Sequence, residues 1–570
     1  MKRFYLHKHT ILLVLILSLA AALRLYQLGN IPLGVTHDEL GYIYNAYAIS
    51  QTGSNVFGER FPFLTWMVRD GFPFLPVPIY FSAPFFFFLP LSAFAGRLPA
   101  ALLGVGDVFL LFLIVKKLFR SDKLALLSGF FLAISPWHLH FSRSAYDPNF
   151  ALFFYLLAIA SFLHEAERKK MPFVSSLSFL FAIFSYRGMS AVFVPLAIIL
   201  IYYTAVKYRM SKKSLGISIV SICIVTASFL FVVLSLGSSY TQEALFFNDP
   251  KIQEAVDKEI REAKGPLWVR RLFLNKPAYI VSKLRENYLR SYSPEFLFLH
   301  TEPHKIYSIW SRGRIYFIDI IFIALGIFFL YKLNKRASLI VFSFLLIGGL
   351  PGLLGGSPYS ARNFFISSSL PILSAGGVIC LFLISKRRQM RYVVGVIIIF
   401  LYSYSFGSYL FDYYERYSYQ FAESWAKSLK DVSFLIQSRG STYDTVIVAN
   451  TTFGDVVQYA FYAGIPVETV QTSWRKRGLS SQGGDIFKIR NVVFQPNCER
   501  VQNLEARFNA LRRTQLLFMH DDCDKKTDPL MKVQDYYGNT VWKVYYEIPR
   551  LSLRGALRQA QGKLGDEAIF

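Results

Sequence analysis

Cysteine and nucleotide-binding signatures are the scarcest features of this sequence. It holds four cysteines among 570 residues, and no two have the spacing of a metal site. No P-loop and no GxGxxG fingerprint occurs, so nothing supports chemistry driven by ATP. No internal repeat and no low-complexity tract is visible either. These absences disfavour zinc proteins, ATP-driven enzymes and repeat architectures.

Acidic residues are also few, since 37 Asp and Glu face 62 Lys and Arg and leave a net charge of +25. Such an excess could indicate a nucleic-acid partner, but the basic residues gather in short loops between apolar runs. Anionic lipid head groups are sufficient partners for loops of that kind. We therefore expect membrane lipids, and no nucleic acid, among the partners.

Long apolar runs are what the sequence has in abundance, with 53% hydrophobic and 17% aromatic residues. All but one of these runs are roughly 17 to 25 residues long, which is enough to cross a bilayer. The exception, 172–186, has 15 residues and is short for a span. Eleven spans are predicted, at 10–29, 97–116, 124–141, 146–163, 172–186, 188–206, 214–236, 314–331, 337–354, 363–384 and 392–411.

Loop charge predicts the sidedness of these spans. Basic clusters precede span one and recur at 116–123, 168–170, 207–213, 332–336 and 386–391. The alternate short loops carry one arginine each: Arg143, Arg187 and Arg362. This is the positive-inside pattern, so we expect a cytoplasmic N-terminus in the plasma membrane and, with eleven spans, an external C-terminus. No small-residue cleavage site follows span one, which we interpret as a retained anchor.

Three polar blocks, 30–96, 237–313 and 412–570, are expected outside, because successive loops alternate between the two sides of the membrane. Within the first, residues 37–50 are expected to form a helix near the membrane surface, with Leu40, Ile43, Tyr44 and Tyr47 on its apolar face. Prolines interrupt residues 77–92, which we interpret as an interfacial or re-entrant piece. The second block predicts amphipathic helices near 251–263 and 267–290.

The third block changes character and predicts an α/β domain. Three apolar segments, 445–449, 491–494 and 515–519, are typical of buried strands separated by polar helices. The fold class expected is therefore a polytopic α-helical membrane protein of about eleven spans with a C-terminal extracytoplasmic α/β domain. The expected domains are 1–411 and 412–550, followed by a disordered tail at 551–570. Cys498 and Cys523 lie on the oxidising side, and the sequence leaves open whether they form a disulfide.

Polar residues at the outer ends of the spans are the candidates for chemistry. Asp38, just after span one, could be a general base or a metal ligand, or a helix-dipole partner. Thr36 and Glu39 have the spacing of a capping box, which gives Glu39 a structural alternative.

Three lone arginines and the residues around them form the second group of candidates. Arg143, Arg187 and Arg362 could clamp a phosphate or, alternatively, reach lipid phosphate by snorkelling. Asp147 could bind substrate or be a helix N-cap, and His138 and His140 could be interfacial residues without a ligand. Asp107 and Asp319 lie within predicted spans and are functional candidates because intramembrane acids are costly.

Five motifs carry a resemblance to a known family. They are His37-Asp38-Glu39, the segment 96–102, Ser135-Pro136 through Asp147, the segment 293–298, and Arg362 followed by Pro371. In this order the chain resembles the bacterial relatives of the dolichyl-phosphate-mannose protein mannosyltransferases, which include aminoarabinose lipid A transferases within the GT-C membrane glycosyltransferases. The resemblance covers roughly residues 10–411.

The resemblance implies an inverting glycosyltransferase that uses a polyprenyl-phosphate sugar. It implies Asp38 as the catalytic base, with substrate-binding roles for His37, Glu39, Arg143, Asp147, Arg187 and Arg362. It also suggests a divalent cation between Asp38 and Asp147. The sequence lacks the WWDYG-type motif of oligosaccharyltransferases, which argues against transfer of a preassembled glycan to asparagine.

Two other functions stay open at this stage. A lipid-linked glycan transporter or flippase should show polar groups at mid-membrane and inverted repeats. A non-catalytic glycan-binding membrane protein would bind the donor without turnover. The acceptor, whether protein, lipid or glycan, and the identity of the sugar cannot be inferred from the residues.

Overall fold

The computed structural model describes residues 2–66, 73–235, 251–299, 305–307, 309, 312–354, 359–479, 485–498, 514–523 and 528–547. The chain divides into two compact units. Unit 1 comprises residues 1–28, 75–81 and 97–417. Unit 2 comprises 29–74, 82–96 and 418–570, so the first external loop is grouped with the C-terminal region. The expected domain bounds themselves stay a prediction.

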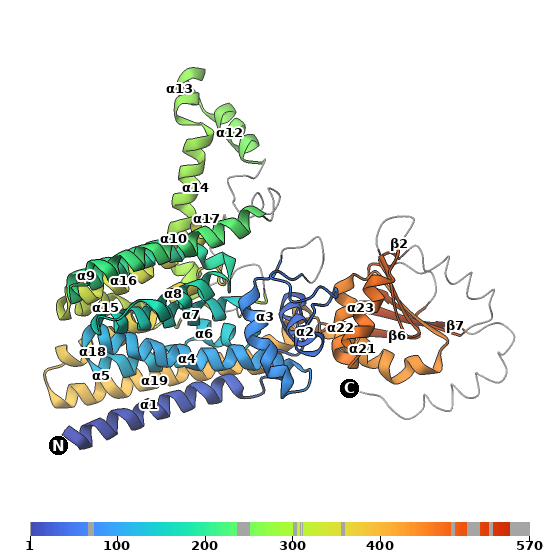
Figure 1. Ribbon diagram of the computed structural model, residues 1–570, viewed down its shortest axis with the longest axis horizontal. Helices are drawn as coiled ribbons and strands as arrows, with labels where there is room; N and C mark the ends of the chain where they lie inside the picture. The colour runs from blue at the N-terminus through green and yellow to red at the C-terminus, as the bar shows by residue number, and fades with distance from the viewer. Residues whose placement is uncertain are drawn as a thin grey trace. The chain divides into compact units, whose positions relative to one another are not determined.

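Unit 1 is a helical bundle, drawn from blue to yellow in Figure 1. The helices that correspond to the expected spans are α1 (Lys2–Leu25), α4 (Ala93–Phe119), α5 (Asp122–Ala133), α6 (Pro136–Ser142), α7 (Asp147–Glu167), α8 (Phe173–Ile183), η2 with α9 (Arg187–Val192, Phe193–Tyr208), α10 (Lys212–Ser235), α15 (Asp319–Leu333), α16 (Lys335–Gly348), α17 (Leu350–Leu354), η5 with α18 (Phe364–Ser368, Leu370–Ile384) and α19 (Arg388–Phe411). The other described helices of unit 1 are α3 (Pro76–Ser82), α12 (Lys251–Glu262), α13 (Leu267–Phe273), α14 (Lys276–Arg290), η4 (Glu295–Leu299) and η6 (Asp412–Tyr417).

Every expected span corresponds to a helix, but the number of crossings is not settled. Within the described residues, eight helices are long and apolar enough to cross a membrane, or nine if the pair α5 and α6, bent by 60°, counts as one span. The spans expected at 172–186 and 314–331 contain α8 with 11 residues and α15 with 15 residues, which are short for a bilayer. The polytopic helical fold is confirmed, and the count of eleven stays a prediction.

Glycine sets the closest helix contact in the bundle. A Cβ atom at Gly326 of α15 would lie 1.9 Å from the Leu373 carbonyl oxygen of α18, and one at Gly377 would lie equally near the Phe322 oxygen. Lipid tails are as apolar as these helices, so the hydrophobic effect does not drive the helices together in a bilayer. Close backbone approach at small residues is instead a main source of attraction.

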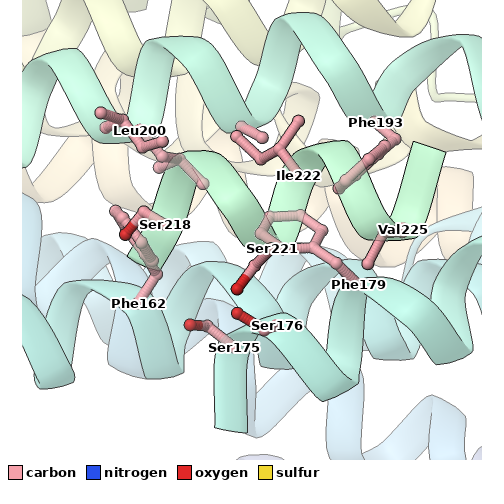
Figure 2. Close-up of a pocket in the computed structure, with 12 residues that line it drawn as sticks. Phe162, Ser175, Ser176, Phe179, Phe193, Leu200, Ser218, Ser221, Ile222 and Val225 are labelled. Carbon is pink, nitrogen blue, oxygen red and sulfur yellow. The ribbon is translucent and has the colours of Figure 1, made fainter. Parts of the chain in front are cut away.

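An apolar pocket lies among α7, α8, α9 and α10. Figure 2 shows Phe179 and Phe193 in its wall and the hydroxyls of Ser175, Ser176 and Ser221 at one side. Serine in such a helix keeps its hydroxyl satisfied by bonding back one turn, as Ser176 does to the Pro172 carbonyl. The pocket is therefore apolar in character despite its serines.

Unit 2 is an α/β unit built on a seven-stranded sheet of order β2-β3-β4-β1-β5-β7-β6. The strands are β1 (Thr445–Ala449), β2 (Gly478–Leu479), β3 (Asp485–Ile489), β4 (Val492–Gln495), β5 (Gln515–His520), β6 (Met531–Gln534) and β7 (Thr540–Glu547). Its helices are α2 (His37–Thr52), η1 (Ala83–Phe87), α20 (Ser418–Gln420), η7 (Glu423–Trp425), α21 (Lys427–Arg439), η8 (Gly440–Thr442), α22 (Phe453–Ala463) and α23 (Val467–Arg475).

The three predicted strands form the centre of this sheet and are confirmed as β1, β4 and β5. Strand β1 is buried along its whole length and pairs in parallel with β4 and β5, with Ile447 opposite Val493 and Leu517. Parallel strands need cover on both faces, which explains why their sequences are continuously apolar.

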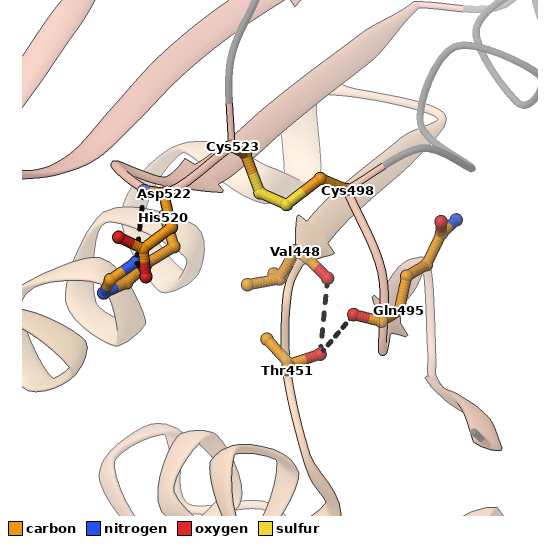
Figure 3. Close-up of a disulfide and its surroundings, with 7 residues drawn as sticks. All are labelled: Val448, Thr451, Gln495, Cys498, His520, Asp522 and Cys523. Atoms are coloured by element: carbon orange, nitrogen blue, oxygen red, sulfur yellow. Dashed lines mark hydrogen bonds and ion pairs between the residues drawn. A yellow bond between two sulfur atoms is a disulfide. The ribbon is translucent and has the colours of Figure 1, made fainter. Parts of the chain in front are cut away.

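A disulfide joins Cys498 and Cys523 and settles the question that the sequence left open. Figure 3 shows the bridge beside β1, where Thr451 donates its hydroxyl to the Gln495 carbonyl oxygen at 3.1 Å. Cys523 packs into a cluster with Ile447, Leu517 and Tyr545. Such bridges persist in oxidising compartments, so the disulfide agrees with the expected external location of this region.

One helical expectation is confirmed in part and another changes. Helix α2 forms over the predicted segment 37–50 and buries ten residues, including Leu40, Ile43 and Tyr44, and its place near the membrane surface stays a prediction. The helix expected at 267–290 is broken in two, because Asn275 caps α14 by accepting from the Ala278 amide at 2.9 Å. The expected tail, 551–570, lies outside the described residues.

Candidate active site

Asp38 is the second residue of α2, at the start that the sequence predicts. Thr36 is the N-cap, and its hydroxyl oxygen accepts a hydrogen bond from the Glu39 amide at 3.2 Å. This confirms the Thr36 half of the expected capping box. The Glu39 side chain is fully buried, whereas the Asp38 side chain is exposed. The cap therefore fixes which of the two carboxylates reaches solvent.

The Asp38 carboxyl group is accessible but poorly solvated. Desolvation by the surrounding protein raises its pKa above the usual value, and the neighbouring charge of His37 opposes this shift. A carboxylate that substrate can reach and that water stabilises poorly is a stronger proton acceptor than a freely solvated one.

The C-terminal α/β region holds the segment that leads into α2. Gln458 of α22 donates to the buried Val35 carbonyl oxygen at 3.1 Å, and Lys430 of α21 donates to the Leu33 oxygen at 3.0 Å. His37 lies against Gly454 in the first turn of α22, where a Cβ atom would come within 1.9 Å of its Nε2. The α/β fold therefore fixes the backbone on which Asp38 stands.

Unit 1 brings together three of the predicted substrate-binding residues. The Tyr186 hydroxyl lies within electrostatic range of Asp147, Arg187, Arg362 and Tyr359. The Arg362 guanidinium also lies over the Tyr359 ring, 5.4 Å from its centroid. All five residues are half-buried. We call Asp147, Tyr186, Arg187, Tyr359 and Arg362 the arginine–tyrosine cluster.

The chemistry of this cluster suits an anionic ligand. Two guanidinium groups and one carboxylate leave an excess positive charge, and the tyrosine hydroxyls can donate hydrogen bonds. Arginine matches phosphate oxygens by its planar fork of donors. The predicted residues in this group therefore carry the charge and the donors that a phosphate ligand would need.

The Arg143 guanidinium is bound by other groups of the protein. Its side chain is 1% exposed and donates to the Leu23 and Arg24 carbonyl oxygens at 2.8 and 3.1 Å. Its guanidinium also contacts the rings of Tyr413 and Tyr414. This geometry favours a tether at the end of α1, and a donor-binding role for Arg143 stays a prediction.

The N-cap alternative for Asp147 is wrong, because Asp147 is the first residue of α7 and the N-cap is Tyr146. His138 and His140 are buried, and His140 Nε2 bonds the Ile306 carbonyl oxygen at 2.7 Å. Their place at the membrane interface stays a prediction.

A buried polar network gives Asp107 the partner that the sequence could not supply. His138 Nε2 lies 3.0 Å from Asp107 Oδ2, and Arg24 donates to His138 Nδ1 at 2.8 Å. The sequence analysis missed Arg24, although a cation inside the predicted span 10–29 was the signal that could have found it. Asp319 is likewise satisfied, by Tyr402 at 2.6 Å and Ser374 at 2.8 Å.

The divalent cation suggested between Asp38 and Asp147 stays a prediction. No group of three or more His, Cys, Asp or Glu residues suited to a metal ion occurs in the described part of the chain. Asp38 and Asp147 belong to different compact units. No step of the reaction proposed below involves a metal ion.

The fold and site define a polytopic membrane protein with an α/β domain, an exposed carboxylate and an arginine–tyrosine cluster. The sequence profile of the family described as dolichyl-phosphate-mannose-protein mannosyltransferase matches residues 73–236. The expected resemblance is thus confirmed over that segment, and it supports a membrane glycosyltransferase. No protein among the curated sequences matches the chain.

Several solved structures are similar at low identity. The oligosaccharyltransferase AglB of Archaeoglobus fulgidus is 14% identical, with 81% of this chain and 64% of that chain covered and a TM-score of 0.49. ArnT of Cupriavidus metallidurans, solved with undecaprenyl phosphate, is 11% identical, with 94% and 98% covered and a TM-score of 0.48. The chain spans about two thirds of the length of the archaeal enzyme.

Proposed function

We propose that this protein is an inverting glycosyltransferase that moves one sugar from a polyprenyl-phosphate donor to an acceptor hydroxyl at the outer face of the plasma membrane. The observation that carries the proposal is the environment of Asp38, an accessible carboxylate whose pKa is raised by desolvation. The family match supports the reaction class, and the disulfide supports the external location.

The reaction requires one base and one anion site. The acceptor oxygen forms a bond to the anomeric carbon as the bond from that carbon to the phosphate oxygen breaks. The acceptor proton passes to the Asp38 carboxylate, and polyprenyl phosphate leaves with the electron pair. Attack opposite the leaving group inverts the anomeric centre. No acid is needed, because the departing phosphate is stabilised as an anion.

Arg187 and Arg362 are assigned to the donor phosphate, with Tyr186 as a further donor and Asp147 as the group that orients the arginines. His37 and Glu39 are assigned to the support of Asp38, because Glu39 is buried beneath the cap and His37 is its charged neighbour. The sugar and the acceptor class, whether protein, lipid or glycan, remain to be identified by experiment.

Replacement of Asp38 by Asn tests the base assignment. The amide cannot accept the proton, so we expect transfer in membranes to fall by roughly 10²–10⁴-fold while donor binding is retained. Asp431→Asn is the matched control, because Asp431 is a carboxylate of the same unit that pairs with Lys427 on the surface. Full activity of Asp38→Asn would refute the assignment.

A transporter or flippase for lipid-linked glycans is the second candidate, and one observation favours it. The bent pair α5 and α6 forms a discontinuous helix, and the break adjoins the buried network of Arg24, His138 and Asp107. Movement of a labelled lipid-linked sugar across the membrane, unchanged in Asp38→Asn and without any glycoside product, would support this alternative.

A further inference from the structure

Helix α13, Leu267–Phe273, has no buried residue. The exposed fractions of its large apolar side chains are 71% for Trp268, 68% for Phe273 and 62% for Leu272. Soluble surfaces rarely leave a tryptophan, a phenylalanine and a leucine exposed together without a partner. The next helix continues the pattern, because Val281 of α14 is also 64% exposed.

Most apolar residues of α13 share one side of the helix. Successive helical residues are rotated by about 100°, which places Trp268, Val269, Leu272 and Phe273 on one side, whereas Leu267 lies with Arg270 and Arg271 on the other. Residues 264–290 contain seven basic residues and one acidic residue, a net charge of +6. The basic residues are Lys264, Arg270, Arg271, Lys276, Lys283, Arg285 and Arg290, and the acidic one is Glu286.

Helix α14 joins α13 to the bundle and sets its direction. The Tyr288 hydroxyl donates to the Leu346 carbonyl oxygen of α16 at 3.0 Å, and Tyr292 donates to the Leu345 oxygen at 2.9 Å. In Figure 1, α14 runs across the direction of the long helices of unit 1 and carries α12 and α13 away from them. Because the long helices are expected to cross the bilayer, a helix that runs across their direction extends along the membrane plane and not through it.

We propose that α13 and the first turn of α14 form an interfacial anchor that binds an anionic lipid surface. Trp268, Leu272 and Phe273 enter the boundary between head groups and acyl chains, where aromatic and aliphatic side chains are favoured. Arg271 and Lys276 contact lipid phosphates beside them. Arg270 has a second task, since it caps α12 by donating to the Ile260 carbonyl oxygen at 2.6 Å.

A bilayer fits this surface better than a protein partner. The apolar side chains lie on one side of a short helix rather than in a groove, and the positive charge of the segment complements anionic head groups. The bilayer also surrounds the helical bundle to which α14 joins α13. A lipid surface is therefore available to α13 without a further binding partner.

A fluorophore at position 272 tests the insertion in the full chain. The background carries Cys223→Ser and Cys380→Ser, which removes both free cysteines, and Leu272→Cys is labelled with an environment-sensitive dye. In nanodiscs containing phosphatidylglycerol we expect several-fold stronger quenching by nitroxide-bearing lipids than by aqueous iodide. Lys258→Cys on the polar side of α12, where the side chain is 69% exposed, should show the reverse.

The charge requirement is tested in the same nanodiscs. The segment exchanges between a state inserted in the lipid surface and a state released into water. Arg271→Gln with Lys276→Gln should favour the released state by roughly fivefold per residue removed, because each basic residue near an anionic surface contributes about 1 kcal/mol. In phosphatidylcholine nanodiscs the double variant should have little effect. Equal iodide quenching at positions 272 and 258 would overturn the proposal, as would a dye at 272 that is shielded from both quenchers, which indicates a protein partner.

Discussion

Asp38 and His37 are neighbours with opposite effects on the proposed proton transfer. Desolvation raises the Asp38 pKa, and the positive charge of His37 lowers it. A protonated Asp38 cannot accept a proton, so activity should be lost as pH falls through this raised pKa. The acidic limb of the curve of activity against pH should thus lie above the pH at which an ordinary aspartate titrates, about 3.9.

Replacement of His37 by Ala should shift the pH dependence of activity in a defined direction. Without the positive neighbour, the Asp38 pKa rises further, and the acidic limb of kcat/KM should move to higher pH. The limb is measured in membranes over a pH series, with Asp431→Asn as the variant that should leave it in place. A limb that moves to lower pH would contradict the assigned electrostatics.

Arg187 and Arg362 predict a change in donor affinity. Each charged hydrogen bond to phosphate contributes roughly 1.5–3 kcal/mol, so either Arg→Gln variant should weaken binding of polyprenyl phosphate by about 10- to 150-fold. Arg→Lys should restore only part of the affinity, since lysine lacks the planar fork. Binding is measured on the purified full chain.

Arg143 supplies the contrast for this experiment. Its guanidinium is occupied by the Leu23 and Arg24 carbonyl oxygens, so Arg143→Gln should lower thermal stability and leave donor affinity near that of the parent protein. If Arg143→Gln instead reduced affinity as strongly as Arg187→Gln at unchanged stability, a direct donor contact for Arg143 would replace the tether.

At the scale of elements, α22 is the support of the α2 start. Gln458 is 2% exposed and satisfies the buried Val35 carbonyl oxygen. Gln458→Leu should leave this oxygen without its donor, cost about 1–3 kcal/mol, and lower kcat through displacement of Asp38. The measurements are thermal unfolding and initial rates at saturating donor.

Gln534→Leu is the matched control, because Gln534 bonds the Gly538 carbonyl oxygen in an exposed hairpin turn. This variant should change the free energy of unfolding by no more than a few tenths of a kcal/mol, and it should leave the transfer rate near that of the parent protein. A full rate in Gln458→Leu together with a large loss of stability would show that α22 supports the fold without positioning Asp38.

At the scale of the whole molecule, sidedness is the property on which the function depends. In intact spheroplasts, a membrane-impermeant reductant followed by an impermeant maleimide should label Cys498 and Cys523, because loop parity places them outside. Cys498→Ser with Cys523→Ser provides the unlabelled control. Labelling that appears only after permeabilisation would place the α/β domain in the cytoplasm and refute an external active site.

Much of the architecture was predictable because its physics is local. A stretch such as 97–116 must cross a membrane or be buried wherever it lies, and Thr445–Ala449 must be covered on both faces. The Thr36 cap likewise depends on residues three apart. The count of crossings was less predictable, because the helices within 172–186 and 314–331 are shorter than their apolar runs suggest.

The sequence by itself determined that this chain is a polytopic membrane protein with an α/β domain and an acidic pair after the first span, because periodicity, loop charge and capping act over a few residues. Only the tertiary structure decided that Asp147, Arg187 and Arg362 gather around Tyr186, that Arg143 and Asp107 have protein partners, and that α22 supports the α2 start. These contacts join residues far apart in the chain, and chain spacing carries no information about which distant polar groups a fold brings within hydrogen-bonding distance.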